Sequence, residues 1–206
     1  WHPSGNYLAF IAWNHPQMPW DGTELRLATL DSVDTMLPDT RAVETIAGGT
    51  DIAIFQPTFS HDGKYLAYVS DDTGWGQIYL YNLARREHRR LTNDAAEHAR
   101  PAWIQGMRTL AWRHDSCAIF ALRTEKGLVR LWRYGLDGTG EPVQAATEFS
   151  AFENIAAAPT EDKLACVASA SAIPPCLIVM EPLESKTPQI ITSSRSIRIK
   201  SEACSV

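Results

Sequence analysis

The sequence has no long hydrophobic run and no excess of basic residues. No stretch approaches the ~18 consecutive apolar residues that a membrane-spanning helix needs; the apolar run at 176–180 has the length of a strand. Lysine and arginine number 19 against 24 aspartates and glutamates, which gives a formal net charge of −5. Because nucleic-acid-binding proteins usually present a basic surface, we expect neither a membrane nor a nucleic acid as partner.

Cysteine is scarce, and the motifs that would indicate a metal site are missing. The four cysteines form no C-x-x-C pair, no histidine stands at zinc-finger spacing from one, and the six histidines are scattered. We therefore expect no metal and no cofactor. Cys166 and Cys176 flank a candidate hairpin tip. Reduced, buried thiols are the expectation there, and a disulfide between them is the alternative.

What the sequence does contain indicates many short strands. Seven tryptophans are many for 206 residues, and 12 glycines and 12 prolines are spread evenly along the chain. Glycine and proline mark turns, so this distribution favours strands joined by turns over a bundle of helices.

A Leu-Ala pair recurs four times with similar surroundings. An aromatic residue stands seven positions before the leucine in the first three copies, and we interpret these aromatics, together with Trp112, as packing between repeats. The leucines are Leu8, Leu66, Leu110 and Leu164, and the preceding aromatics are Trp1, Phe59 and Trp103.

The second copy predicts four antiparallel strands. A Ser-His-Asp-Gly turn at 60–63 precedes an alternating run at 64–70; a turn at 71–76 precedes a second run at 77–83. Apolar residues occupy both faces of the first run, so neighbouring sheets are expected on both sides. Repeats of ~40–50 residues with four strands are typical of β-propeller blades.

We therefore predict an all-β fold, a β-propeller of about four blades. The blades are expected at about 1–48, 49–98, 99–148 and 149–206, as an incomplete part of a larger propeller. Helical repeats would show apolar spacings of three and four, and a sandwich would not repeat its turns. The basic run at 85–90 is interpreted as part of a solvated hairpin formed by the last two strands.

The second copy, FSHDGKYLAYVSDDTGWGQIYLYNL (59–83), resembles the WD-like repeat of two groups of propellers. One is the TolB type, and the other belongs to serine peptidases of the prolyl oligopeptidase family. The loop HPQMPWDGTEL (15–25) and the stretch RPAWIQGMRTLAW (100–112) resemble the acylaminoacyl peptidase/dipeptidyl aminopeptidase branch of that family. The resemblance covers the first ~135 residues.

This resemblance implies a propeller that covers an α/β-hydrolase domain and restricts which peptides reach its Ser-Asp-His triad. The sequence contains no G-x-S-x-G, the motif of the nucleophile in such hydrolases, so no catalytic residue is assigned. We expect a cytoplasmic, non-catalytic part of a peptidase. Its partners would be the hydrolase domain and peptides, and open blade faces would favour self-association.

Two alternatives remain open at this point. The first is a TolB-like protein-interaction propeller without enzymatic activity, which would be periplasmic. The second is an intact four-bladed ring that is completed by a strand at 196–200, whose sequence alternates suitably.

The 14–24 loop is the main candidate for a substrate or interdomain site. It is about five residues longer than the equivalent turn of the second repeat, and it carries His15, Met18, Trp20 and Asp21. Extended loops on a rigid scaffold often hold binding groups. The competing interpretation is that prolines stiffen this loop while Trp20 packs over the blade edge.

Two further candidates lie in the next repeat. Asp71, Asp72 and Trp75 occupy the equivalent turn, where a carboxylate pair would attract the amino terminus of a peptide. Arg100 precedes the third aromatic position and would bind a carboxylate. Against this, most such charges only solvate turns.

Overall fold

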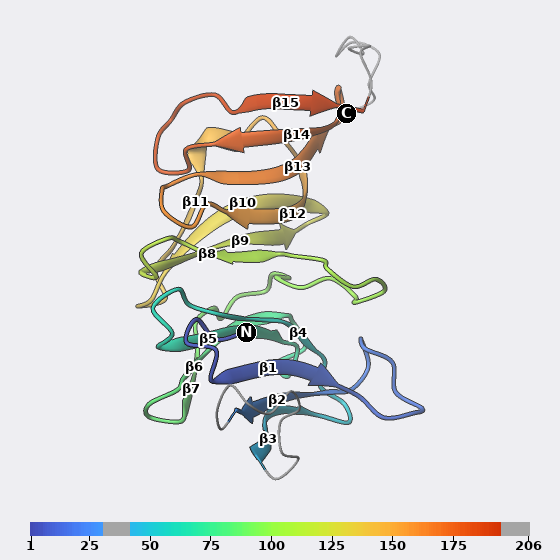
Figure 1. Cartoon of the computed structure of the whole chain (residues 1–206). Helices are drawn as coiled ribbons and strands as arrows, with labels where there is room; N and C mark the ends of the chain where they lie inside the picture. The colour runs from blue at the N-terminus through green and yellow to red at the C-terminus, as the bar shows by residue number, and fades with distance from the viewer. Residues whose placement is uncertain (31–41, 195–206) are drawn as a thin grey trace. The chain divides into compact units, whose positions relative to one another are not determined.

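The computed structural model describes residues 1–30 and 42–194, which form antiparallel sheets (Figure 1). The described ranges contain no α-helix, and therefore no helix long and apolar enough to cross a membrane. Each sheet is a simple meander in which consecutive strands pair. The strands are β1 (Tyr7–Ala12), β2 (Thr23–Thr29) and β3 (Val43–Gly49); β4 (Ile54–Phe59), β5 (Tyr65–Ser70), β6 (Gln77–Asn82) and β7 (Glu87–Arg90); β8 (Leu110–Trp112), β9 (Ala118–Glu125), β10 (Leu128–Gly135) and β11 (Gly140–Pro142); and β12 (Ala151–Ala157), β13 (Leu164–Ala170), β14 (Ile173–Met180) and β15 (Gln189–Ser193).

The prediction of an all-β propeller fold is confirmed. Its blades are the sheets β1–β3, β4–β7, β8–β11 and β12–β15. They belong to two compact units: Trp1–Met107 holds the first two blades, and the unit that begins at Arg108 holds the last two. The exact blade limits given from the sequence stay a prediction, and the candidate strand at 196–200 lies outside the described residues.

In the first unit, two blades bury apolar side chains against each other. Leu25 of β2, Ile54 of β4 and Leu66 of β5 are essentially inaccessible to solvent and belong to one core cluster. Five of the six residues of β5 are buried, so both of its faces are covered, as the alternating sequence predicts. Burial of these apolar side chains is the main source of stability in such a unit.

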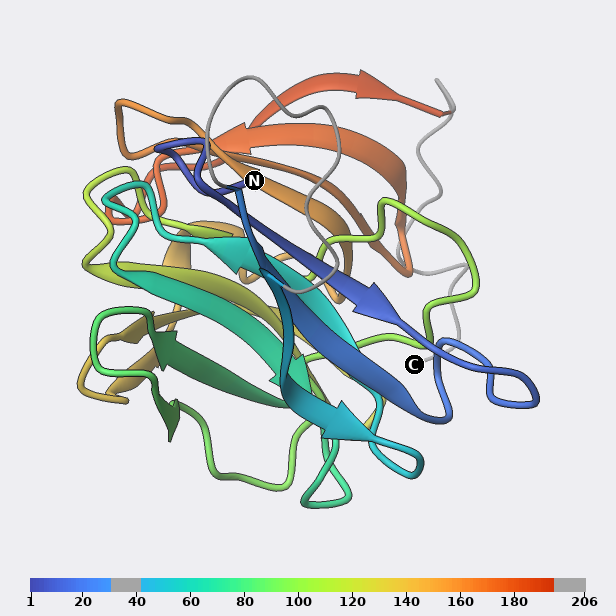
Figure 2. The same cartoon turned by 60° about the horizontal axis from the view of Figure 1, so that its bottom comes forward.

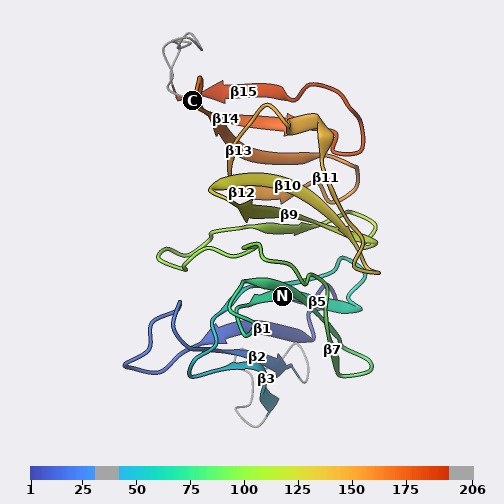
Figure 3. The same ribbon diagram turned by 180° about the vertical axis from the view of Figure 1, so that it is seen from behind.

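The second unit has its own core, which includes two cysteines. Phe120 of β9 and Ile155 of β12 pack in the same cluster as Cys166 of β13 and Cys176 of β14. Both thiols are free, so the alternative of a disulfide between them is not realised. Burial raises the pKa of the Cys166 thiol to about 12. Figure 3 shows the order of the strands β12 to β15 from behind.

The third repeat has a different register from the one that its Leu-Ala pair predicts. Leu66 lies in β5, the second strand of its blade, whereas Leu110 lies in β8, the first strand of its blade. The turn after β8 contains Ser116 at φ 62°, and the corresponding turn after β4 contains Gly63 at φ 72°. The matching stretch therefore begins at Trp112, and the alignment on Leu110 is wrong.

This register also corrects the roles of the tryptophans. Trp112 takes the place of Phe59 and is buried, as expected for packing between repeats. Trp103 precedes β8 outside any strand and is 71% exposed, and Trp1 is 75% exposed. These two side chains do not pack in the core, so their interpretation as inter-repeat anchors is wrong.

The basic run at 85–90 is only partly a turn. Glu87–Arg90 form β7, which pairs with β6, so the run covers the turn and the last strand of a hairpin, as predicted. All four residues of β7 are exposed. Charged side chains are common on exposed edge strands, because they oppose pairing with other chains.

Candidate functional site

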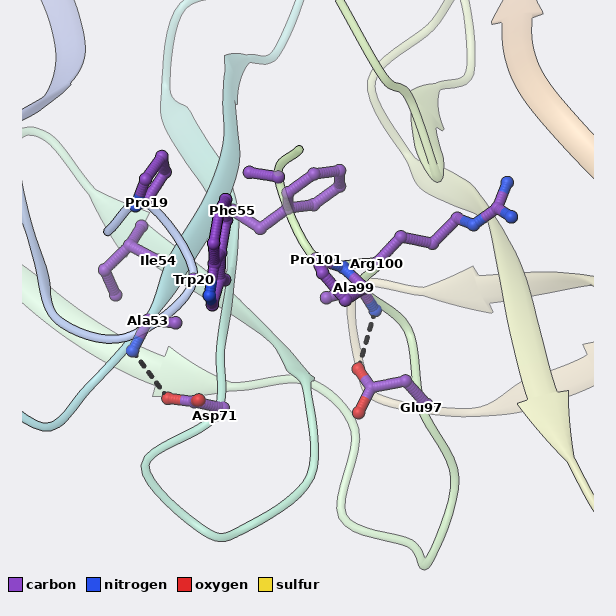
Figure 4. A pocket seen from close by; sticks show the side chains of 11 residues that line it. Pro19, Trp20, Ala53, Ile54, Phe55, Asp71, Glu97, Ala99, Arg100 and Pro101 are labelled. Atoms are coloured by element: carbon purple, nitrogen blue, oxygen red, sulfur yellow. Dashed lines mark hydrogen bonds between the residues drawn. The ribbon is translucent and has the colours of Figure 1, made fainter. Parts of the chain in front are cut away.

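A cavity of about 370 Å³ opens at one end of the first unit (Figure 4). We call it the Trp20 pocket. Its walls come from the β1–β2 loop, the start of β4, the end of β5 and the segment that follows β7. Figure 2 shows the β1–β2 loop extending beyond the strands. The lining residues are Pro19, Trp20, Ala53, Ile54, Phe55, Asp71, Glu97, Ala99, Arg100, Pro101 and Ala102.

Two hydrogen bonds hold the start of β4 at the Trp20 pocket, one between the two blades and one within the second blade. The Ile54 amide donates to Oγ1 of Thr23, at 2.6 Å, so the start of β4 is held against the start of β2. The Ala53 amide donates to Oδ1 of Asp71, at 2.7 Å, as Figure 4 shows. A backbone amide is thereby satisfied by a carboxylate, and the Asp71 side chain is held in place.

Glu97 forms a second acidic wall. Its Oε1 accepts a hydrogen bond from the Ala99 amide at 2.8 Å, and its Oε2 accepts one from the Gly76 amide at 3.1 Å. Nearby, the Gln77 side chain donates to the Asp94 carbonyl oxygen at 2.8 Å and ties this segment to β6. A Cβ at Gly76 would lie 1.9 Å from Glu97 Oε1, so any larger residue here would displace the Glu97 carboxylate.

The β1–β2 loop places Trp20 at the mouth of the pocket. The Met18 amide donates to Asp21 Oδ2 at 3.0 Å, and the Asp21 amide donates to the Met18 carbonyl oxygen at 3.0 Å. This turn presents Trp20, which is 37% exposed. Where the loop returns to β2, a Cβ at Gly22 would lie 2.0 Å from the Thr50 carbonyl oxygen, so the two connections are in close contact.

Trp20 also borders a second, more open cavity of about 550 Å³. We call it the Asp51 pocket. Its other lining residues come from the same loop and from the β3–β4 connection: Pro16, Gln17, Asp21, Thr50 and Asp51.

The charged groups of the Trp20 pocket are two carboxylates and a guanidinium group. Asp71 is half-buried, and this burial raises the pKa of its carboxyl group despite the hydrogen bond from Ala53. The Arg100 side chain extends away from Trp20 and Asp71 (Figure 4). The space beside the indole ring is therefore bordered by negative charge.

The structure brings together three of the eight residues predicted from the sequence: Trp20, Asp71 and Arg100 line the Trp20 pocket. Asp21 lines the Asp51 pocket. The remaining four residues line neither pocket: Asp72 accepts a hydrogen bond from the Tyr79 hydroxyl group, and His15, Met18 and Trp75 are exposed. A functional role of all eight stays a prediction.

Sequence reasoning missed Glu97 and Phe55. Glu97 belongs to no motif, since its position depends on amides of Gly76 and Ala99. Phe55 looked like an ordinary strand residue, and it is 7% exposed. In the sequence, only Gly76, directly before β6, indicated weakly that another segment approaches closely there.

The pocket is suited to binding rather than to covalent chemistry. Its lining contains an indole ring, apolar side chains, carboxylates and a guanidinium group, but no hydroxyl or thiol nucleophile. In residues 1–30 and 42–194, no three His, Cys, Asp or Glu side chains are grouped so that they could hold a metal ion.

Solved peptidase structures share this fold. A puromycin-hydrolysing peptidase from Mycobacterium tuberculosis matches 97% of the chain, with a TM-score of 0.83 and 23% identity. A second puromycin hydrolase matches 94%, with a TM-score of 0.79 and 28% identity. Prolyl oligopeptidase B from Galerina marginata matches 93%, with a TM-score of 0.68 and 13% identity. The chain resembles the propeller portion of prolyl oligopeptidase-family peptidases. It spans 29%, 28% and 26% of these three chains.

The chain is also similar to a solved structure of another class. TolB from Acinetobacter baumannii matches 94% of the chain, with a TM-score of 0.67 and 19% identity, and the chain covers 42% of it. No family model matches the sequence, and no curated protein matches it. The likeness to peptidases therefore rests on the fold together with the 28% identity to the puromycin hydrolase.

Proposed function

We propose that this chain is the non-catalytic propeller of a serine peptidase of the prolyl oligopeptidase family, in the acylaminoacyl peptidase branch. It would limit access to an α/β-hydrolase domain to short, flexible peptides. The match of 94% of the chain to a puromycin hydrolase at 28% identity is the main support. A propeller rigidified by buried strands excludes folded proteins by its size.

The proposal assigns the nucleophile, the general base and the oxyanion hole to the hydrolase domain. It also places the protein in the cytoplasm, where thiols such as Cys166 and Cys176 stay reduced. The Trp20 pocket is the proposed contact for the peptide as it passes the propeller, because it combines apolar surface with charged groups.

The proposal is tested first on the chain alone. It should not hydrolyse aminoacyl or acyl-peptide chromogenic substrates, and a fluorophosphonate probe should leave it unlabelled. Labelling of this chain would contradict the assignment of the chemistry to another domain.

The gating role is tested in the full-length protein. Trp20→Ala should change KM or kcat for long peptides more than for a dipeptidyl substrate, because only a long substrate contacts the propeller. Trp75→Ala serves as the matched control, since Trp75 is similarly exposed and lines neither pocket. Equal kinetics for both variants and the parent would contradict gating at this pocket.

A TolB-like interaction propeller is the second candidate, supported by the match to TolB from Acinetobacter baumannii. The gene sequence after the codon for Val206 discriminates between the two candidates. A segment of ~250 residues with G-x-S-x-G followed by Asp and His would establish the peptidase. A stop codon there would favour the interaction propeller.

A further inference from the structure

We propose that the Trp20 pocket binds the basic side chain, lysine or arginine, of an extended peptide. The proposal takes from the proposed function only that the ligand is a peptide. It adds the chemical class of the residue that is recognised, which the fold and its relatives leave open.

The charges at the pocket favour a basic ligand. Asp71 and Glu97 border the pocket, and both are half-buried. A carboxylate has about four acceptor positions, and the amides of Ala53, Gly76 and Ala99 use some of these. Because the amides also fix the carboxylates, an incoming ammonium or guanidinium group meets acceptors that are already oriented.

The shape and the apolar surface of the pocket fit a long side chain with a charged end. The indole ring of Trp20 stands beside Phe55 and Ile54 in the pocket (Figure 4). A lysine or arginine side chain has an apolar stem of methylene groups and a charged end. Its stem would pack on these side chains while its charge reaches the carboxylates, and the ring face also attracts a cation.

The same charges disfavour an acidic ligand. Arg100 lines the pocket, but its side chain extends away from Trp20 and the two carboxylates (Figure 4). A ligand carboxylate beside Trp20 would therefore lie against like charges, which is unfavourable.

The adjacent Asp51 pocket should also favour positively charged groups. It shares Trp20 with the first pocket and adds Asp21 and Asp51. Carboxylate side chains thus line both of the pockets that Trp20 borders. An extended peptide can place residues in both pockets, so we infer a chain rather than a small amine as the ligand.

The test uses capped peptides, so that no terminal charge contributes. Acetyl-Ala-Phe-Lys-Phe-Ala-amide is titrated into the 206-residue chain by calorimetry, beside versions with glutamine or glutamate in place of lysine. We expect the lysine peptide to bind about fivefold or more tightly than the glutamine peptide, with the glutamate peptide weakest. The preference should shrink at high salt. Equal affinities, or tightest binding of the glutamate peptide, would overturn the proposal.

An uncapped glutamine peptide separates the two sources of positive charge. If its free ammonium group restores the affinity of the capped lysine peptide, the pocket recognises a peptide amino terminus, and the assignment to a side chain is overturned. If it binds like the capped glutamine peptide, the assignment stands.

Two neighbouring aspartates provide a matched pair of variants. Asp71→Asn removes a charge from the pocket yet keeps an oxygen that can accept the Ala53 amide, whereas Asp72→Asn removes a charge outside the pocket. We expect the first to abolish the preference for lysine and the second to retain it. If Asp71→Asn melts at a much lower temperature, Glu97→Gln replaces it. Retention of the full preference by these folded pocket variants would overturn the proposal.

The outcome is distinguishable from a failure of the proposed function. A lysine preference of the chain, together with a full-length protein that hydrolyses no peptide, would contradict the peptidase proposal alone. Equal binding of basic and neutral peptides by an active, gated peptidase would contradict this inference alone.

Discussion

The ion pair between Arg113 and Asp162 connects two blades of the second unit and permits a quantitative test. Arg113 follows β8, and Asp162 precedes β13. Nε and Nη2 of Arg113 donate to the two carboxylate oxygens of Asp162, each at 2.6 Å. The side chains are 17% and 30% exposed. The energetic effect of breaking a bidentate pair with this burial should be intermediate between that for an exposed pair and that for a fully buried pair.

Asp162→Asn should therefore lower the free energy of unfolding by about 2 kcal/mol. The loss is below that of an unpaired buried charge, because Arg113 keeps its contact with Asp115 at 2.9 Å. For a chain of this size, the expected decrease in Tm is about 4–8 °C. Thermal unfolding followed by circular dichroism measures it. Glu161→Gln is the matched control, since Glu161 pairs with Lys163 on the surface, and it should leave Tm unchanged.

The pH dependence of the stability provides a second test of this ion pair. The hydrogen bonds from Arg113 hold the pKa of Asp162 below its ordinary value. The unfolded chain then binds a proton at a higher pH than the folded one, so this stabilisation is present above about pH 4 and is lost as the pH falls through the folded pKa. The difference in Tm between the parent chain and Asp162→Asn should shrink in acid. A difference that is absent at neutral pH, or unchanged in acid, would refute the reasoning.

Three further predictions concern single side chains. Gly76→Ala should displace Glu97, because the new Cβ would lie 1.9 Å from that carboxylate. This variant should therefore bind the lysine peptide more weakly than the parent chain. Gly49→Ala is the control: its Cβ would have its nearest neighbour 3.9 Å away, so it should leave peptide binding unchanged. Leu66→Ala should destabilise the chain by about 2–5 kcal/mol in urea unfolding, and a loss well below this range would contradict its place in the core. The face of β14 opposite the core carries Leu177, which is 36% exposed. We expect the chain to self-associate through this apolar face. Leu177→Lys should therefore lower the average molar mass that light scattering measures. A monomeric parent chain would contradict that expectation.

Much of the fold was predictable because it depends on local sequence. Alternation over 65–70 and the glycine at 63 determine a strand and the turn before it, and both are present in the structure. The third repeat was misaligned because Ser116 occupies the turn position where Gly63 stands in the second repeat. A Leu-Ala pair with a nearby aromatic fits the first or the second strand of a blade equally well, so only the pairing of β8 with β9 identifies its place.

The candidate site was predictable only where it lies on a recognisable loop. Trp20 and Asp71 occupy turns that the repeat identifies, and both line the pocket. Glu97 was not predictable, because its place depends on the amides of Gly76 and Ala99 and not on its own neighbours in the sequence. Asp71 and Asp72 are adjacent and chemically identical in the sequence, yet only Asp71 lines the pocket. The Asp71 side chain is oriented by its hydrogen bond from the Ala53 amide, and that of Asp72 by its hydrogen bond from the Tyr79 hydroxyl group.

The separate anchoring of Trp20 and of the acidic wall has an evolutionary consequence. The tryptophan is carried by a loop that makes its own internal turn, whereas Asp71 and Glu97 are held by main-chain amides of other connections. Insertions or substitutions between β1 and β2 can therefore change the aromatic component while the anionic one is conserved. Related propellers would be free to diversify their ligands by exchanging that short stretch alone.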